Sequence, residues 1–101
     1  MLNTTKVFEL LDAKAKVDVN DDITTQEYWD ALTDELSGDE YETIKFLKGL
    51  DNDKLEQVSE IFSDLSQRFK SQTFISGLND VFDSHPTADI GQEIKWAEEE
   101  L

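Results

Sequence analysis

The stretch that decides the fold is residues 55–69, LEQVSEIFSDLSQRF. Its apolar residues recur at alternating steps of three and four, the spacing of one face of an α-helix, at Leu55, Val58, Phe62, Leu65 and Phe69. Ile61 widens this apolar stripe. The pattern predicts a single continuous helix whose stripe is covered by the rest of the chain. Its opposite, solvated face carries Glu56, Glu60, Asp64 and Gln67.

Three helices are expected at or before this stretch from their capping residues and stops. The first is expected over about residues 4–16, capped by Asn3, Thr4 or Thr5, and a loop should follow over residues 17–25. Thr24 and Glu27 have the spacing of a capping box, which predicts that a second helix begins there and stops at Gly38. Asp39 should cap a third helix that ends near Gly49, and Asp51 or Asn52 should cap the central one.

Two more helices are expected after the central one. Ser71 should open a helix that ends near His85, because Pro86 disfavours further helical turns. Gly77 lies inside this helix, where glycine costs about 1 kcal/mol against alanine, so it predicts a close crossing with another helix. Thr87 or Asp89 should cap the last helix, which carries Ile90, Ile94, Ala97 and Leu101 on one face, with Trp96 off that stripe.

The fold class that these patterns predict is all-α, with about six helices in a single compact antiparallel bundle or a short array of helical hairpins. A chain of 101 residues is expected to form one domain, residues 1–101. Leu, Ile, Val and Phe together supply 28 residues, enough for a modest core. We therefore expect the acidic chain to fold alone.

The charge of the chain is strongly negative and unevenly distributed. There are 24 Asp and Glu against 9 Lys and Arg, a net charge of −15. Residues 18–42 hold 10 acids and no base, residues 45–70 hold five of each, and residues 80–101 hold seven acids and Lys95. A surface that is acidic only for solubility does not require this segregation. The distribution favours an acidic binding patch for a basic protein, whereas nucleic acid and anionic membranes should be repelled.

The predicted partner-binding residues lie on the second helix, its entry loop and the start of the third helix. Two tyrosines are included because aromatic residues among charges often anchor interfaces. The set is Asp21, Asp22, Glu27, Tyr28, Asp30, Asp34, Glu35, Asp39, Glu40 and Tyr41. The alternative interpretation is that these residues form an ordinary solvated helix face.

Catalytic, cofactor and metal sites are not expected. The chain has no cysteine, and it carries no phosphate-binding glycine loop, metal-binding helix motif or nucleophile elbow. A calcium loop starting at Asp18 would place Ile23 where glycine is needed and Trp29 where a bidentate glutamate is needed. His85, the only histidine, is expected to interact with a helix C-terminus. We expect a non-enzymatic, cytoplasmic protein without a signal peptide or membrane span.

Residues 71–101, SQTFISGLNDVFDSHPTADIGQEIKWAEEEL, resemble the tail of small acidic all-helical immunity proteins of bacterial toxin systems, including contact-dependent inhibition and polymorphic toxin systems. The shared features are a phenylalanine-rich helix, a turn with proline and a last acidic helix. The resemblance covers the C-terminal third of the chain. It implies a protein that neutralises one cognate toxin, commonly a basic nuclease, and it transfers no individual binding residue.

The predicted function is therefore that of an immunity protein whose acidic surface blocks a basic toxin domain. One alternative is a nucleic-acid mimic that inhibits a DNA-binding protein, and another is a helical adaptor module with an apolar groove. The immunity protein and the mimic should bind in a salt-sensitive manner, and the adaptor should not. We expect a monomer or a weak dimer, with no direct contact to nucleic acid or membrane.

Overall fold

The computed structural model describes residues 2–18 and 20–101 and confirms the predicted all-α class. These residues contain seven helices and no strand. The helices are α1 (Thr4–Ala15), α2 (Asp22–Leu36), α3 (Glu40–Lys48), α4 (Asn52–Ser59), α5 (Phe62–Phe69), α6 (Gln72–Ser84) and α7 (Gly91–Glu99). The count exceeds the predicted six because the central helix is divided.

The division falls inside the stretch from Leu55 to Phe69. Helix α4 ends at Ser59, and Ile61, with φ −108° and ψ 11°, precedes α5 without a side-chain cap. The prediction of one continuous helix was therefore wrong, although the first four positions of its stripe are all buried. The periodicity could not reveal the break, because the apolar residues keep their three- and four-residue spacing through the turn while the chain changes direction. Helix α4 packs on α1, whereas α5 packs mainly on α7.

Most helices begin where a short polar side chain accepts a hydrogen bond from the first turn. Asn3, Asp39, Asp51 and Ser71 cap α1, α3, α4 and α6, as predicted. The predicted cap at Thr24 was wrong. Asp21 caps α2 instead and accepts from the Thr24 backbone N–H at 3.0 Å, so α2 begins inside the predicted loop. Val19, in the same predicted loop, and Met1 lie outside the described residues.

Helix α7 begins at Gly91 after Ile90, which provides no side-chain cap, so the predicted caps at Thr87 and Asp89 were wrong. Both residues instead contact α4. The Thr87 hydroxyl accepts from Asn52 Nδ2 at 2.8 Å, and the Asp89 backbone N–H donates to Glu56 Oε2 at 3.0 Å. These bonds join positions that are far apart in sequence, which is why a local capping rule missed them.

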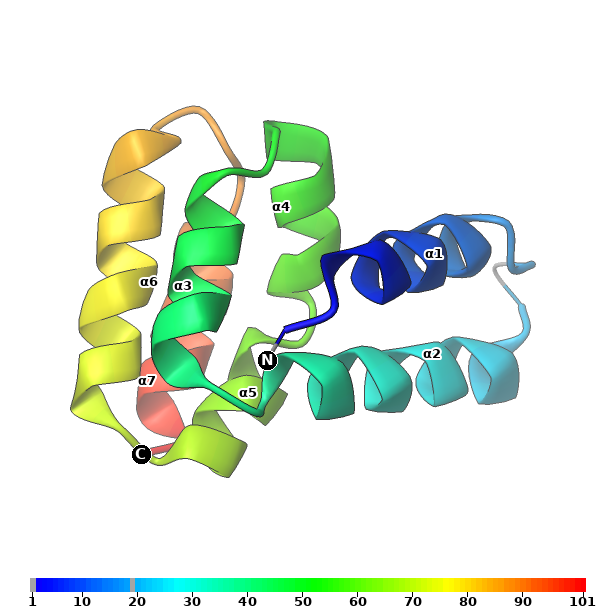
Figure 1. Ribbon diagram of the computed structural model, residues 1–101, viewed down its shortest axis with the longest axis horizontal. Coiled ribbons are helices and arrows are strands. Elements are labelled where there is room, and N and C mark those ends of the chain that lie inside the picture. Colours follow the sequence, from blue (N-terminus) through cyan, green and yellow to red (C-terminus); the bar gives the residue numbers. More distant parts are fainter. Residues whose placement is uncertain (1, 19) are drawn as a thin grey trace.

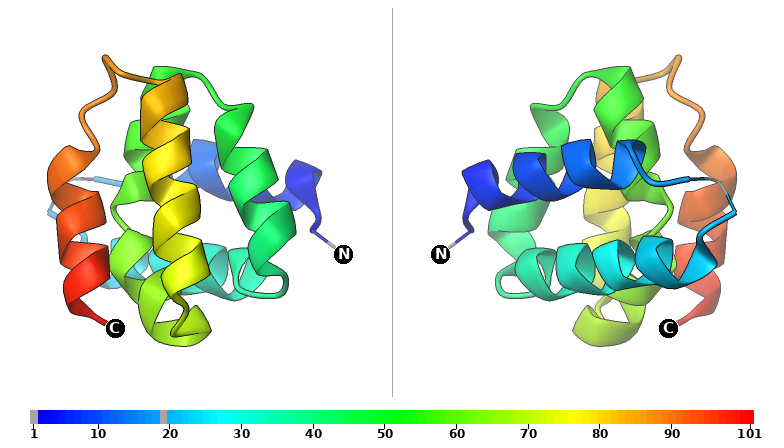
Figure 2. Two further views of the ribbon diagram at one scale, coloured as in Figure 1. Left: turned by 90° about the vertical axis from the view of Figure 1, so that its left-hand side faces the viewer. Right: turned by 90° about the vertical axis from the view of Figure 1, so that its right-hand side faces the viewer.

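The helices lie in two directions. Figure 1 shows α1 and α2 side by side and across the direction followed by α3, α4 and α6. The right-hand view of Figure 2 shows the same α1–α2 pair from its outer side. Helix α6 packs between α3 and α7. This arrangement does not confirm the predicted antiparallel bundle or hairpin array.

The core is formed by the apolar faces of all seven helices. Phe62 and Phe74 are the largest completely buried side chains, and Leu11, Leu36 and Ile90 join them from three other segments. Ser66 is also buried and donates to the Ala97 carbonyl at 2.6 Å, which satisfies its hydroxyl where α5 meets α7. The predicted stripe of α7 is buried at Ile90, Ile94 and Ala97, whereas Leu101 is exposed.

Gly77 allows α6 to approach α3 closely, as predicted from its position. A Cβ atom built on Gly77 would lie 2.6 Å from Cγ1 of Ile44. Because real Cβ atoms do not approach other carbon atoms so closely, any larger residue would force the two helices or Ile44 to move. Gly77 therefore lowers the helix propensity of α6 but allows α6 to pack closely on α3.

Candidate protein-binding surface

The outer face of α2 is the candidate site that the acidic run predicts. Glu27, Asp30 and Asp34 are separated by three and four residues, so they share one face of the helix, and all three are exposed. The other side of α2 is committed to the core through Leu32 and Leu36. The helix therefore presents carboxylates to solvent while its apolar side holds it in place.

Two of the predicted acids are held in ion pairs with neighbouring helices. Asp34 Oδ1 lies 2.8 Å from Arg68 Nη2 of α5, and Glu35 Oε2 lies 3.4 Å from Lys6 Nζ of α1. Asp21 is also engaged as the α2 cap. The backbone N–H of Thr24, followed by its hydroxyl, lowers the pKa of the Asp21 carboxyl. Asp22, Glu27 and Asp30 are thus the predicted acids of α2 that lie outside these ion pairs and this cap.

The predicted residues at the start of α3 border a hollow. Asp39, Glu40 and Tyr41 line a hollow of about 740 Å³ between α3 and α6. Tyr41 is 77% exposed there, and Glu40 Oε1 accepts from Ser71 Oγ at 2.8 Å. Tyr28, the other predicted aromatic anchor, is half-buried on α2. Tyr41 is therefore the more exposed of the two predicted aromatic anchors.

The structure places Asp64 of α5 near Asp30 of α2, and Glu100, just after α7, near Asp64. Partial burial raises the pKa of the Asp64 carboxyl, the negative charge of Asp30 raises it further, Arg68 opposes this and Glu100 adds to it. Gln67 of α5 donates to Glu100 Oε2 at 2.7 Å. We call Glu27, Asp30, Asp34, Asp64 and Glu100 the acidic face.

Sequence reasoning had placed Asp64 on the solvated face of a continuous helix, with no connection to α2. The acidic composition of residues 80–101 pointed to an acidic surface that includes Glu100, but no local pattern reveals that α7 packs on α5. The predicted solvated face of residues 55–69 also includes Glu60, whose Oε2 accepts a hydrogen bond from Trp29 Nε1 at 2.9 Å. The predicted solvated face is therefore partly used to bind neighbouring helices.

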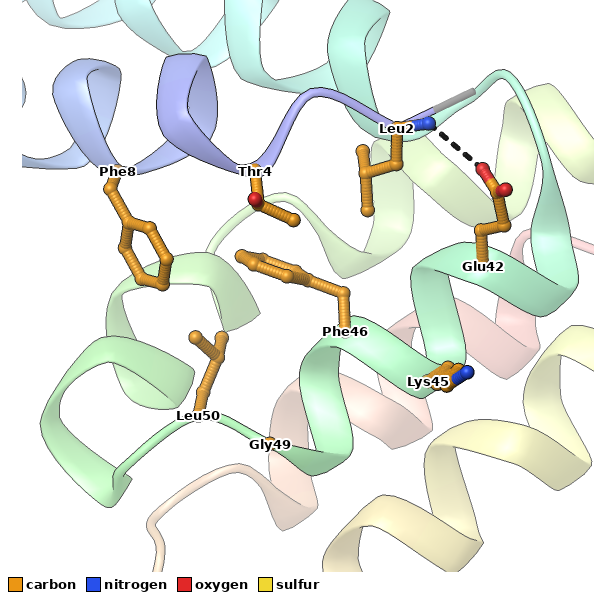
Figure 3. A pocket seen from close by; sticks show the side chains of 8 residues that line it. All are labelled: Leu2, Thr4, Phe8, Glu42, Lys45, Phe46, Gly49 and Leu50. Atoms are coloured by element: carbon orange, nitrogen blue, oxygen red, sulfur yellow. Dashed lines mark hydrogen bonds between the residues drawn. The ribbon is translucent and has the colours of Figure 1, made fainter.

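A second candidate is the apolar hollow between α1 and α3, of about 460 Å³. Figure 3 shows Phe8, Phe46 and Leu50 converging on it from α1, α3 and the following turn. The two phenylalanine rings lie 5.5 Å apart between centroids, and Phe8 is 37% exposed. At the rim, the Leu2 backbone N–H donates to Glu42 Oε2 at 2.8 Å. This hollow could accept an apolar side chain.

The solitary histidine has a structural position. His85 is half-buried at the C-terminus of α6, as predicted for a residue at a helix end. Its Nδ1 lies 3.0 Å from the Val81 carbonyl oxygen, and its Nε2 lies 2.7 Å from that of Leu50. The ring thus ties the end of α6 to the α3–α4 turn, and both nitrogens already face protein groups.

Within residues 2–18 and 20–101, no group of three or more metal-binding side chains is gathered in one place. No helix among these residues has both the length and the apolar character needed to cross a membrane. Comparison with known proteins finds no matching family model, no matching curated protein and no matching solved structure.

Proposed function

We propose that this protein is a protein-binding inhibitor of the immunity type, which neutralises a basic, nuclease-type toxin through its acidic face. The protein acts by occupying a surface of its partner and performs no chemistry of its own. An enzyme that cleaves nucleic acid needs a positively charged cleft, and an acidic protein that fits there excludes the substrate. The resemblance of residues 71–101 to acidic immunity proteins supports the same proposal.

The observation that carries the proposal is the charge balance of the acidic face. Lys6, Lys14 and Arg68 are each bound to a carboxylate of the same chain. Asp22, Glu27 and Asp30 are exposed and form no ion pair with another of the described residues. A basic partner approaching α2 therefore meets unpaired negative charge and little repulsion. Such charges chiefly raise the association rate, and they lose this effect as salt screens them.

The experiment begins with capture of the partner. The immobilised protein is incubated with an extract of its source organism at low salt, and the bound protein is eluted with salt and identified. Association and dissociation rates with the purified partner are then measured at several salt concentrations. We expect a basic partner whose nuclease activity is lost on binding. A partner that is not basic, or a nuclease that stays active in the complex, contradicts the proposal.

A matched pair of double variants locates the interface. Glu27→Lys with Asp30→Lys reverses two acids of the acidic face, and Glu9→Lys with Asp83→Lys reverses two exposed acids on α1 and α6. Both variants have the same net charge. We expect the α2 variant to slow association about tenfold or more at low salt and to flatten its salt dependence. Equal effects of the two variants would mean that only the total charge matters.

The helical adaptor is the second candidate, because the α1–α3 hollow offers an apolar groove of about 460 Å³. An adaptor that binds through this hollow should bind equally well at low and high salt. Phe8→Ala should then weaken binding, since Phe8 lines the hollow and is partly exposed. If Phe8→Ala weakens binding of the captured partner while the α2 double variant leaves it unchanged, the protein is an adaptor and not an immunity protein.

A further inference from the structure

Both tryptophans of the chain line the same hollow. Trp29 of α2 and Trp96 of α7 face a space of about 270 Å³ that is completed by Ser59, Glu60, Ser63 and Glu93. The hollow lies where α2, the α4–α5 turn and α7 meet. It borders the acidic face but shares none of that face's residues. The acidic face therefore does not explain why both tryptophans line this hollow.

Trp96 is not explained by the core. Its side chain is 51% exposed, whereas Ile94 and Ala97, its neighbours on α7, are buried. An aromatic ring that is half exposed leaves apolar surface in contact with water, so it gives only part of the free energy that full burial would provide. In the first turn of the same helix, Glu93 Oε2 is buried and has no hydrogen-bond partner among the described residues. Such an oxygen normally finds a donor, so its position requires an explanation.

Two residues of the lining, Trp29 and Glu60, already bind a cation of this chain. Lys14 Nζ lies 5.4 Å from the centroid of the Trp29 ring and 2.6 Å from Glu60 Oε2. An indole ring and a carboxylate together thus bind the ammonium group of this chain. Trp96 and Glu93 supply the same two components to the lining of the hollow, and Glu93 Oε2 lacks a donor among the described residues.

We propose that the hollow between Trp29 and Trp96 binds an arginine side chain of a basic protein partner, which donates to Glu93 and stacks on Trp96. This proposal rests on the proposed function, because it names how the basic partner is anchored beside the acidic face. Lys14 already neutralises Glu60, so Glu93 supplies the charge that the incoming side chain meets.

Arginine fits this site better than lysine. The guanidinium group is planar, which lets it lie flat on an indole ring, and it sheds its hydration more readily than an ammonium group. Its five N–H donors can bond a carboxylate and a serine hydroxyl of the lining at the same time. It also spreads its charge over several atoms, which reduces the repulsion from Lys14.

The test uses a small probe, N-acetyl-arginine amide, with the intact protein. The indole N–H signals of the two tryptophans are followed by nuclear magnetic resonance during the titration. We expect a saturable shift of the Trp96 signal. The citrulline analogue, which is nearly isosteric but uncharged, should produce no shift at the same concentrations, and the lysine analogue should bind several-fold more weakly. Equal shifts with citrulline and arginine would overturn the proposal.

Three variants distinguish arginine binding in the hollow from non-specific attraction to the negative charge of the protein. Glu93→Gln should weaken arginine binding about tenfold, the worth of one charge-assisted hydrogen bond. Trp96→Ala should weaken it about threefold to fivefold, as expected for a partly exposed cation–π contact. Glu98→Gln removes the same charge from an exposed position of α7 outside the hollow and should leave binding unchanged.

Thermal melts of each variant establish that the fold is retained, and Trp96→Leu replaces Trp96→Ala if the latter unfolds. Parent-like binding by Glu93→Gln, or an equal loss in Glu98→Gln, would overturn the arginine site. Failure of the two proposals can be told apart. If the α2 double variant impairs binding of the captured partner but the arginine probe does not bind, only the anchor is wrong. If the probe binds but the captured partner is not basic, only the proposed function is wrong.

Discussion

Residues 45–70 and residues 18–42 are consecutive parts of the same chain with opposite physical characters. The first region balances its acids and bases and places Leu55, Val58 and Phe62 completely inside the core. The second carries 10 acids without a base and buries only one side of its helix. Core packing therefore restricts many side chains of residues 45–70. In residues 18–42 it restricts only the buried side of α2, and the exposed side can carry any charge.

The comparison also shows how the two regions depend on each other. The unbalanced acids of residues 18–42 obtain their bases from other helices, as Asp34 does from Arg68 and Glu35 from Lys6. Exposed pairs of this kind contribute about 0–1 kcal/mol each. The folding free energy therefore comes mostly from buried apolar side chains and little from these ion pairs. Three substitutions, in the core, at a helix crossing and on the acidic face, test where the folding free energy comes from.

The largest effect is expected at the centre of the apolar region. Phe62→Ala removes a completely buried ring and leaves a cavity, so we expect it to lower the free energy of unfolding by about 3–5 kcal/mol. Denaturation with urea measures this change. Phe8→Ala is the control, because Phe8 is partly exposed and should cost much less. A loss under about 1 kcal/mol at Phe62 would refute the central position of the stripe.

A smaller effect is expected at the α3–α6 crossing. Gly77→Ala places a methyl group 2.6 Å from Ile44 Cγ1. Overpacking costs about 1–3 kcal/mol and the gain in helix propensity returns about 1 kcal/mol, so a net loss of up to about 2 kcal/mol is expected.

The control for this crossing is the same substitution in an Ile44→Ala background, measured by the same denaturation. Without the Ile44 side chain, Gly77→Ala should become neutral or stabilising, because only the propensity gain remains. An equal loss in both backgrounds would show that the glycine is needed for a reason other than this contact.

The smallest effect is expected on the acidic face. The pKa of Asp64 is raised above its ordinary value of 3.8 by partial burial and by Asp30, so its ionised form is disfavoured in the folded state. That cost is present above the folded-state pKa and disappears as pH falls through it. Asp64→Asn should therefore stabilise the protein at pH 7 by up to about 0.5 kcal/mol, with no gain at a pH below 3.8.

Thermal melts across this pH range measure the difference, and Asp83→Asn, an exposed substitution on α6, is the control. A gain from Asp64→Asn that persists unchanged at low pH would show that its cause is not the charge of Asp64. An equal gain from Asp83→Asn would show that only the total charge of the protein matters.

Local sequence rules predicted the elements with the strongest local signals. Asp39 and Ser71 were identified as caps, Pro86 marked the end of α6, and Gly77 indicated a close crossing. The same rules failed where distant residues decide the outcome. The central stripe kept its period through the α4–α5 turn, and α7 begins without a side-chain cap after residues that bond to α4.

The candidate site was only partly accessible to the same reasoning. The acidic run identified Glu27 and Asp30 because their charge and spacing are properties of the sequence. Asp64 could not be added, because its proximity to Asp30 depends on the packing of α2 on α5. The pairing of Trp29 with Trp96 was equally hidden, since they come from helices that are far apart in the chain.

The sequence by itself determined the helical class, the apolar stripes and the excess of negative charge, because these follow from residue type and short-range spacing. Tertiary structure alone decided which carboxylates became paired, which joined α2 on one face and which hollow received both tryptophans. The physical reason is range. Helix period and capping act within a few residues, whereas ion pairs, desolvation and helix crossings depend on residues that only the folded chain brings together.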